Sequence, residues 1–113
     1  MDQLIKNVPH AVPFELEKLV QYEEGRVVSL TLAQQDEVGI TLFAFDEGES
    51  IRTHAAGGDA MAVILDGKAR ITIDEQTFYP KAGDGIIMPA GVPHSVSALT
   101  RFKMILTVVK AKA

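Results

Sequence analysis

Two histidines and one aspartate are the residues of this chain whose types and spacing favour metal or ligand chemistry. His54 ends the segment 48–54, and His94 follows the bend at 89–91. Neutral imidazole is the commonest metal ligand in proteins. Two histidines are one ligand short of a catalytic zinc or non-haem iron site, and Asp59 is the nearest candidate for the third. The sequence therefore predicts either a weakly held divalent metal (iron, manganese, nickel or zinc) or a metal-free pocket.

Both readings stay open for these side chains. Strict alternation points Asp59 to the face opposite Ala60, but the Gly57-Gly58 pair permits a bulge that would turn it inward. Otherwise Asp59 bonds the bend or faces water. The two histidines, in turn, could hydrogen-bond each other, a backbone carbonyl or a water without any metal.

Further residues are expected to line the same interior space. They are Arg52, Ala56, Ala60, Phe43, Met88 and Met104. The alanines leave room beside the imidazoles, and the methionines would make the pocket apolar and adaptable. Arg52 shares the parity of His54 and could anchor an anionic group at the mouth, unless it is an exposed arginine. No Ser-His-Asp order, phosphate loop or paired glutamates stand out, so catalysis is an open question.

The elements that must position these residues are short strands. Apolar alternation predicts strands over 28–33, 38–45, 51–56, 61–65, 69–74, 77–79, 86–88, 94–99 and 101–108. Residues 14–24 fit a helix or a strand. Asp66-Gly67-Lys68 between two apolar runs predicts a β-hairpin. Short strands with Gly and Pro turns indicate an all-β sandwich or barrel with little or no helix.

Length and charge exclude several classes of protein. The 113 residues fit one domain, with an N-terminal arm over 1–13 and a frayed tail over 110–113. The net charge is −4 and the lysines and arginines are scattered, so nucleic acid is not an expected partner. We find neither a membrane-length apolar run nor a secretory signal, so we expect no membrane partner and a cytoplasmic location. The strand over 38–45 is apolar on both faces, which favours burial on both sides or a homodimer.

The spacing of glycines, prolines and histidines resembles the two motifs of the cupins. Gly83, five residues, Pro89, one residue, Gly91, two residues and His94 match the second motif, with Ala98 where asparagine is common. The first motif is matched by Gly48, five residues, His54 and the closing Gly67, but the family's second histidine falls on Ala56 and its glutamate on Ala60. The resemblance implies a jelly-roll barrel, often dimeric, that holds a metal through three histidines and a glutamate.

This chain keeps two of those four ligands. We therefore expect a single-domain cupin over 1–113 that binds a small molecule, with or without a metal, around His54 and His94. One alternative is a metal-dependent oxygenase, isomerase or lyase in which Asp59, water or substrate completes the coordination. Another is a non-catalytic structural or sensory dimer whose pocket is vestigial.

Overall fold

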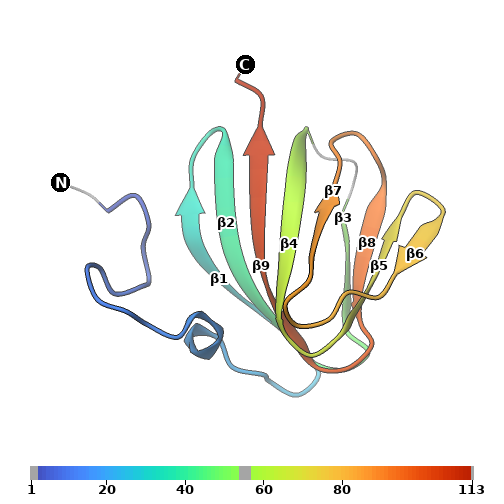
Figure 1. The fold of residues 1–113 in the computed structure, drawn as a ribbon, viewed down its shortest axis with the longest axis horizontal. Helices are drawn as coiled ribbons and strands as arrows, with labels where there is room; N and C mark the ends of the chain where they lie inside the picture. The colour runs from blue at the N-terminus through green and yellow to red at the C-terminus, as the bar shows by residue number, and fades with distance from the viewer. Residues whose placement is uncertain (1–2, 54–56, 113) are drawn as a thin grey trace.

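The computed structural model describes residues 3–53 and 57–112 and shows two antiparallel sheets (Figure 1). The larger sheet has the order β1-β2-β9-β4-β7 and the smaller has the order β3-β8-β5-β6. The strands are β1 Val27–Gln34, β2 Val38–Phe45, β3 Ser50–Thr53, β4 Gly58–Asp66, β5 Ala69–Ile73, β6 Gln76–Phe78, β7 Gly85–Met88, β8 His94–Ala98 and β9 Phe102–Lys110. One 3₁₀ turn, η1 Leu16–Leu19, is the helical element of the described chain. The expected all-β jelly-roll barrel is confirmed.

Alternation along the strands builds the core between the sheets. On β4, Ala60, Ala62 and Ile64 are buried, whereas Asp59, just before them, and Met61, between the two alanines, are exposed. The smaller sheet follows the same period and sends Ile71 and Val96 inward. The alternation predicted for the strand over 69–74 is present in β5, because Arg70 is exposed between two buried neighbours.

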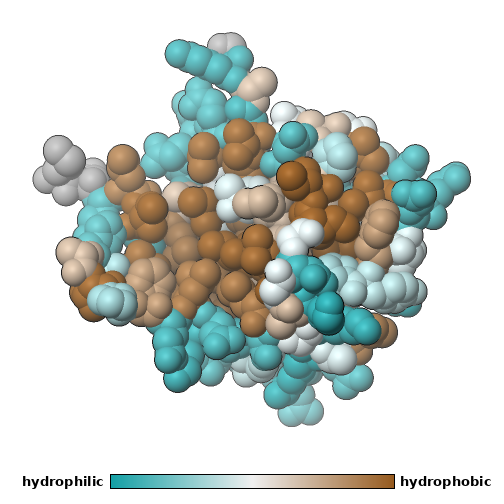
Figure 2. Space-filling view, viewed as in Figure 1, coloured by the Kyte–Doolittle hydropathy of each residue, from teal (hydrophilic) through white to brown (hydrophobic). Residues whose placement is uncertain are grey.

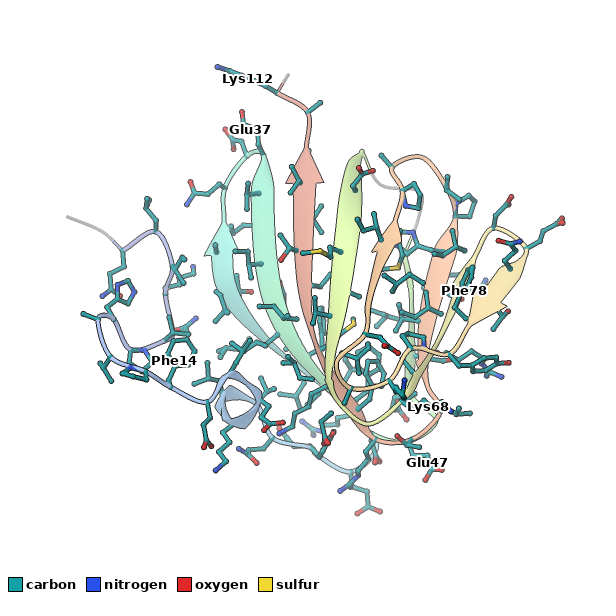
Figure 3. The ribbon with its side chains drawn as sticks, in the orientation of Figure 1. Phe14, Glu37, Glu47, Lys68, Phe78 and Lys112 are labelled. Carbon is teal, nitrogen blue, oxygen red and sulfur yellow. The ribbon has the colours of Figure 1, made fainter. Side chains whose placement is uncertain are left out.

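The two ends of the barrel differ in packing. At one end the rings of Phe45 and Phe102 stack with centroids 4.5 Å apart, and both side chains are fully buried. Lys68 and Glu47 lie at this closed end, whereas Glu37 lies at the opposite end (Figure 3). Some apolar residues that pack against the core towards that opposite end are only partly buried; they include Ile51, Ile73, Leu106 and Val108. We call this end, where β8 begins and these residues are partly exposed, the open end of the barrel.

The turn at Asp66-Gly67-Lys68 joins the two sheets, so the predicted hairpin is wrong. Strand β4 pairs with β7 and β9, whereas β5 pairs with β6 and β8. Gly67 does have the expected positive φ, at 74°. However, its neighbour Lys68 exchanges hydrogen bonds with Thr100, from its N–H to the hydroxyl (3.0 Å) and from the Thr100 N–H to its carbonyl (3.2 Å). These bonds hold the turn against the β8–β9 loop, which directs β5 into the other sheet.

The N-terminal segment covers the outer face of β1 and β2. Buried Val20 packs with Leu32, Leu42 and Ala44 in a second apolar cluster outside the barrel. The Lys6 N–H donates to the Leu32 carbonyl over 2.7 Å, so residues of the expected arm lie along the β1 edge. At the other terminus, β9 continues through residue 110, one residue into the expected tail.

Tyr22 fastens this segment to the closed end of the barrel. Its hydroxyl donates to Asp66 Oδ2 over 2.6 Å, and burial, followed by that bond, raises the pKa of the phenol. Arg101 and Lys103 place their charged groups 5.4 and 5.0 Å from the ring centroid. Buried Lys103 also donates to the Glu17 carbonyl over 2.7 Å. A buried cation is thereby satisfied by a ring and a backbone acceptor.

Candidate functional site

His94 is the first residue of β8 and lies on the inner face of the smaller sheet. Its neighbours on both sides are in register, Thr53 of β3 and Ile73 of β5. The side chain is buried, with 9% of its surface exposed. The preceding bend is a tight turn in which the Val92 N–H donates to the Pro89 carbonyl over 3.3 Å. The turn delivers one imidazole to the interior at the open end.

Hydrogen bonding fixes which ring nitrogen of His94 is available. Nδ1 lies 3.2 Å from the Val92 carbonyl oxygen. A carbonyl only accepts, so Nδ1 must carry the proton and donate, which leaves a lone pair on Nε2 of the neutral ring. Metal-ligating histidines are commonly oriented in this way by a bond from their other nitrogen. His94 Nε2 is therefore the atom suited to a metal or to a donor group of a ligand.

Four of the expected pocket residues lie on the inner face. Ala60 and Met88 are neighbours across β4 and β7 and are both buried. Met104 is fully buried on β9, and Phe43 is half-buried beside Phe45. Ala60 stands where the resemblance places a glutamate, and its methyl group offers no ligand atom. Ala60 and Met88 lie towards the His94 end, whereas Phe43 and Met104 pair with each other two residues from the stacked Phe45 and Phe102.

Asp59 does not point into the barrel. It lies on the exposed face of β4, and its Oδ1 accepts a hydrogen bond of 2.8 Å from the Ala90 N–H. The pairing of β4 with β9 is regular from Gly58 to Ile64, so the bulge that would have turned Asp59 inward is not formed. The structure therefore corrects the expectation of Asp59 as a third metal ligand. Its carboxylate instead holds the turn that precedes His94.

His54 and Ala56 lie outside the described residues, so the structure does not place the second imidazole. Thr53, the last residue described before His54, pairs in register with His94. Among the residues that the structure does describe, we find no group of three side chains from His, Cys, Asp and Glu that could hold a metal. His94 is therefore the one histidine that the described residues place in this pocket.

Arg52 does not share the face of His94. Arg52 pairs with Ser95 on the outer face of the smaller sheet, while His94 and Val96 point inward. Arg52 is therefore not at the mouth of the His94 pocket, and the alternative of an exposed arginine is the one that the structure shows. It instead lines a separate outer groove with Arg70, which alternation on one strand could not reveal because β3, β8 and β5 are distant in the sequence.

The fold and site define a two-sheet β-barrel with a histidine directed inward at its open end. A family model described as a cupin domain matches residues 41–110, more than half of the chain, and the chain belongs to this family. A search of curated proteins gave no match. Within the described chain, no helix is long and apolar enough to cross a membrane.

Solved structures agree over nearly the whole chain. A conserved protein of unknown function from Streptococcus pyogenes is 43% identical, with a TM-score of 0.95 over 99% of this chain and 98% of that one. A cupin superfamily protein from Desulfitobacterium hafniense is 36% identical, with a TM-score of 0.90 over 95% of this chain and 98% of that one. A cupin 2 conserved barrel domain protein from Leptotrichia buccalis is 38% identical, with a TM-score of 0.83 over 86% of this chain and 47% of that one.

Proposed function

We propose that this chain is a cytoplasmic cupin that binds a small molecule at the open end of its barrel, with His94 Nε2 as the polar anchor. The observation that carries the proposal is the bond from Nδ1 to the Val92 carbonyl, which leaves Nε2 as an acceptor. A buried imidazole with one nitrogen unused costs free energy unless a partner is supplied. A ligand or a metal is such a partner.

The apolar surroundings favour a ligand held mainly by shape. Partly buried Leu106 and Val108 face inward towards this end, and buried Ala60, which is level with Val108, lies there with its strand neighbour Met88. Small-molecule sites are usually apolar with a few polar groups that fix orientation. We infer a compact ligand with an apolar body and one group that donates to nitrogen or chelates a metal.

A metal fits this site only in part. We propose that His54, which directly follows the strand partner of His94, and His94 together hold a divalent iron, manganese, nickel or zinc ion. Strict alternation would put residue 54 on the face of Arg52, so this proposal requires the alternation to stop at Thr53, where β3 ends. Ala60 supplies no carboxylate and Asp59 is engaged at the turn, so the metal would be weakly held and its other positions taken by water or the ligand. Such a metal would supply a Lewis acid that polarises a ligand oxygen. If the protein is a metal-dependent enzyme, water or substrate must complete the coordination of the metal.

Metal titration of three histidine variants tests this proposal. We expect His54→Ala and His94→Ala each to abolish binding of Zn²⁺ or Mn²⁺ measured by calorimetry, after the purified protein has been treated with a chelator. His10→Ala is the matched control, because His10 lies in the exposed arm. A metal affinity that is unchanged in His94→Ala would contradict metal binding at this site. Small acids and chelators can also be screened by thermal shift. A compound that raised the melting temperature of His94→Ala as much as that of the wild type would contradict the role of His94 as the polar anchor.

We also propose that the outer face of the larger sheet is covered by a second copy of the chain. Figure 2 shows hydrophobic side chains gathered over the middle of this sheet. Met61, Ile87 and Val109 are 43%, 55% and 54% exposed, and they lie on adjoining strands. Apolar patches of this kind mark interaction sites in many proteins. Light scattering should give the mass of a dimer for the wild type and of a monomer for Ile87→Lys. Gln35→Lys adds the same charge at an exposed turn and should stay dimeric. A monomeric wild type would contradict the proposal.

A further inference from the structure

The outer face of the smaller sheet carries two rows of polar side chains aligned across the strands. The pairing register sets Arg52, Ser95, Thr72 and Thr77 in the first row and Ser50, Ser97 and Arg70 in the second. Tyr79, which follows β6, lies beside the second row in the same groove. These eight residues line one groove of about 370 Å³ together with Ile51 and Val96. His94 points to the other face of the same sheet, so this groove is distinct from the barrel interior.

The groove is cationic although the chain is acidic. Its described lining contains Arg52 and Arg70 and no carboxylate, whereas the whole chain has a net charge of −4. The ion pairs found among the described residues use other cations, so neither arginine is neutralised by one of them. Two positive charges are therefore available to a negative ligand.

The side chains of the groove are partly held in place. Arg70 Nε donates to Ser97 Oγ over 3.2 Å, and the hydroxyls of Thr72 and Thr77 lie 3.2 Å apart. Using Nε in this way leaves the two terminal nitrogens of the Arg70 guanidinium to bind a ligand. A fixed guanidinium loses less conformational entropy on binding than a free one.

We propose that this groove binds a small hydroxylated molecule that carries an oxyanion, either a phosphate or a carboxylate. Arginine binds both groups through paired N–H donors. The strands of Arg52 and Arg70 are separated by β8, so their Cα atoms lie about 12 Å apart by ordinary strand spacings, within reach of one ligand. The serine and threonine hydroxyls between them can donate to or accept from sugar-like hydroxyls.

Calorimetric titration at low salt tests the groove with four probes. We expect glucose 6-phosphate or glucuronate to bind, inorganic phosphate to bind more weakly, and glucose, which lacks the charge, not to bind. Whichever of the first two binds more tightly identifies phosphate or carboxylate as the preferred oxyanion. Amide chemical-shift changes on adding the tighter probe should be confined to β3, β8, β5 and β6.

Two arginine variants and two controls give the decisive comparison. Arg52→Gln and Arg70→Gln should each weaken binding about tenfold or more, the effect of losing one charge-assisted contact. Arg26→Gln removes the same charge from an exposed site outside the groove and should change little. His94→Ala should bind the probe normally, which separates this groove from the barrel site. Failure of both anionic probes to bind saturably, or an equal loss in Arg26→Gln, would overturn the proposal.

Discussion

Gly67→Ala tests the turn that closes the barrel and sends the chain from one sheet to the other. A Cβ at this position would overlap the Arg101 carbonyl oxygen and would lie 2.9 Å from Phe102 Cα. These are backbone atoms next to the stacked Phe102 ring, so they cannot move aside as a flexible side chain could. The positive φ of 74° adds a conformational cost of its own for alanine.

The matched control is Gly48→Ala. Gly48 has a similar φ of 82°, but a Cβ there would meet nothing within 4 Å. The unfolding free energy of this control should therefore fall only by the cost of holding alanine in the left-handed backbone conformation, about 1 to 2 kcal/mol. Gly67→Ala adds overpacking of about 1 to 3 kcal/mol to that same term, and the clash with rigid backbone places it at the upper end.

Urea unfolding followed by circular dichroism measures this difference. We expect Gly67→Ala to lose at least about 2 kcal/mol more unfolding free energy than Gly48→Ala, a large part of the 5 to 15 kcal/mol that holds a typical domain together. Equal losses would show that the close approach of Gly67 to the Arg101 carbonyl does not constrain this turn. A Gly67→Ala protein too unstable to purify, alongside a folded Gly48→Ala protein, would agree with the reasoning.

Three other changes probe the closed end and the interior. The bond from the Gly25 N–H, followed by that from Arg101, lowers the pKa of Asp46 to about 2. The stabilisation from these bonds is therefore complete above pH 3.8 and is lost as the pH falls towards 2. In Asp46→Asn, the unfolding free energy measured in urea should depend less on pH over that range. Tyr22→Phe removes the 2.6 Å bond from its hydroxyl to the β4 carboxylate and should lower the unfolding free energy by about 1 kcal/mol, measured by the same method. Ala60→Glu introduces a carboxylate into the interior, so its melting temperature should fall without metal and recover with Zn²⁺ or Mn²⁺, whereas Ala60→Gln should not recover with metal. The first prediction would be contradicted if Asp46→Asn kept the pH dependence of the wild type, and the second if Tyr22→Phe kept its unfolding free energy. The third would be contradicted if metal did not raise the melting temperature of Ala60→Glu.

Alternation along single strands predicted much of the fold. The wet face of β5, with Arg70 between Ala69 and Ile71, follows from period two, and Asp59 lies opposite Ala60 as strict alternation requires. Such a pattern identifies residues that share a face, because successive side chains on a strand point to opposite sides. It was therefore reliable wherever one face was clearly apolar.

Pairing between distant strands could not be predicted in the same way. Gly67 has the positive φ that the sequence indicated, but that conformation suits any sharp turn, and the bonds between Lys68 and Thr100 decided the route. The parity of Arg52 with His54 suggested a place at the mouth of the pocket, with an exposed arginine as the alternative. Only the register that sets Arg52 opposite Ser95 showed that it faces outward.

The protonation of the His94 ring tests the central claim most directly. A long-range ¹H–¹⁵N correlation spectrum identifies the protonated nitrogen of each histidine in the neutral state. We predict that His94 carries its proton on Nδ1, and that adding Zn²⁺ or a tight ligand shifts the Nε2 resonance while that of His10 is unchanged. A neutral His94 protonated on Nε2, with Nδ1 as the unprotonated nitrogen, would contradict this account of the site.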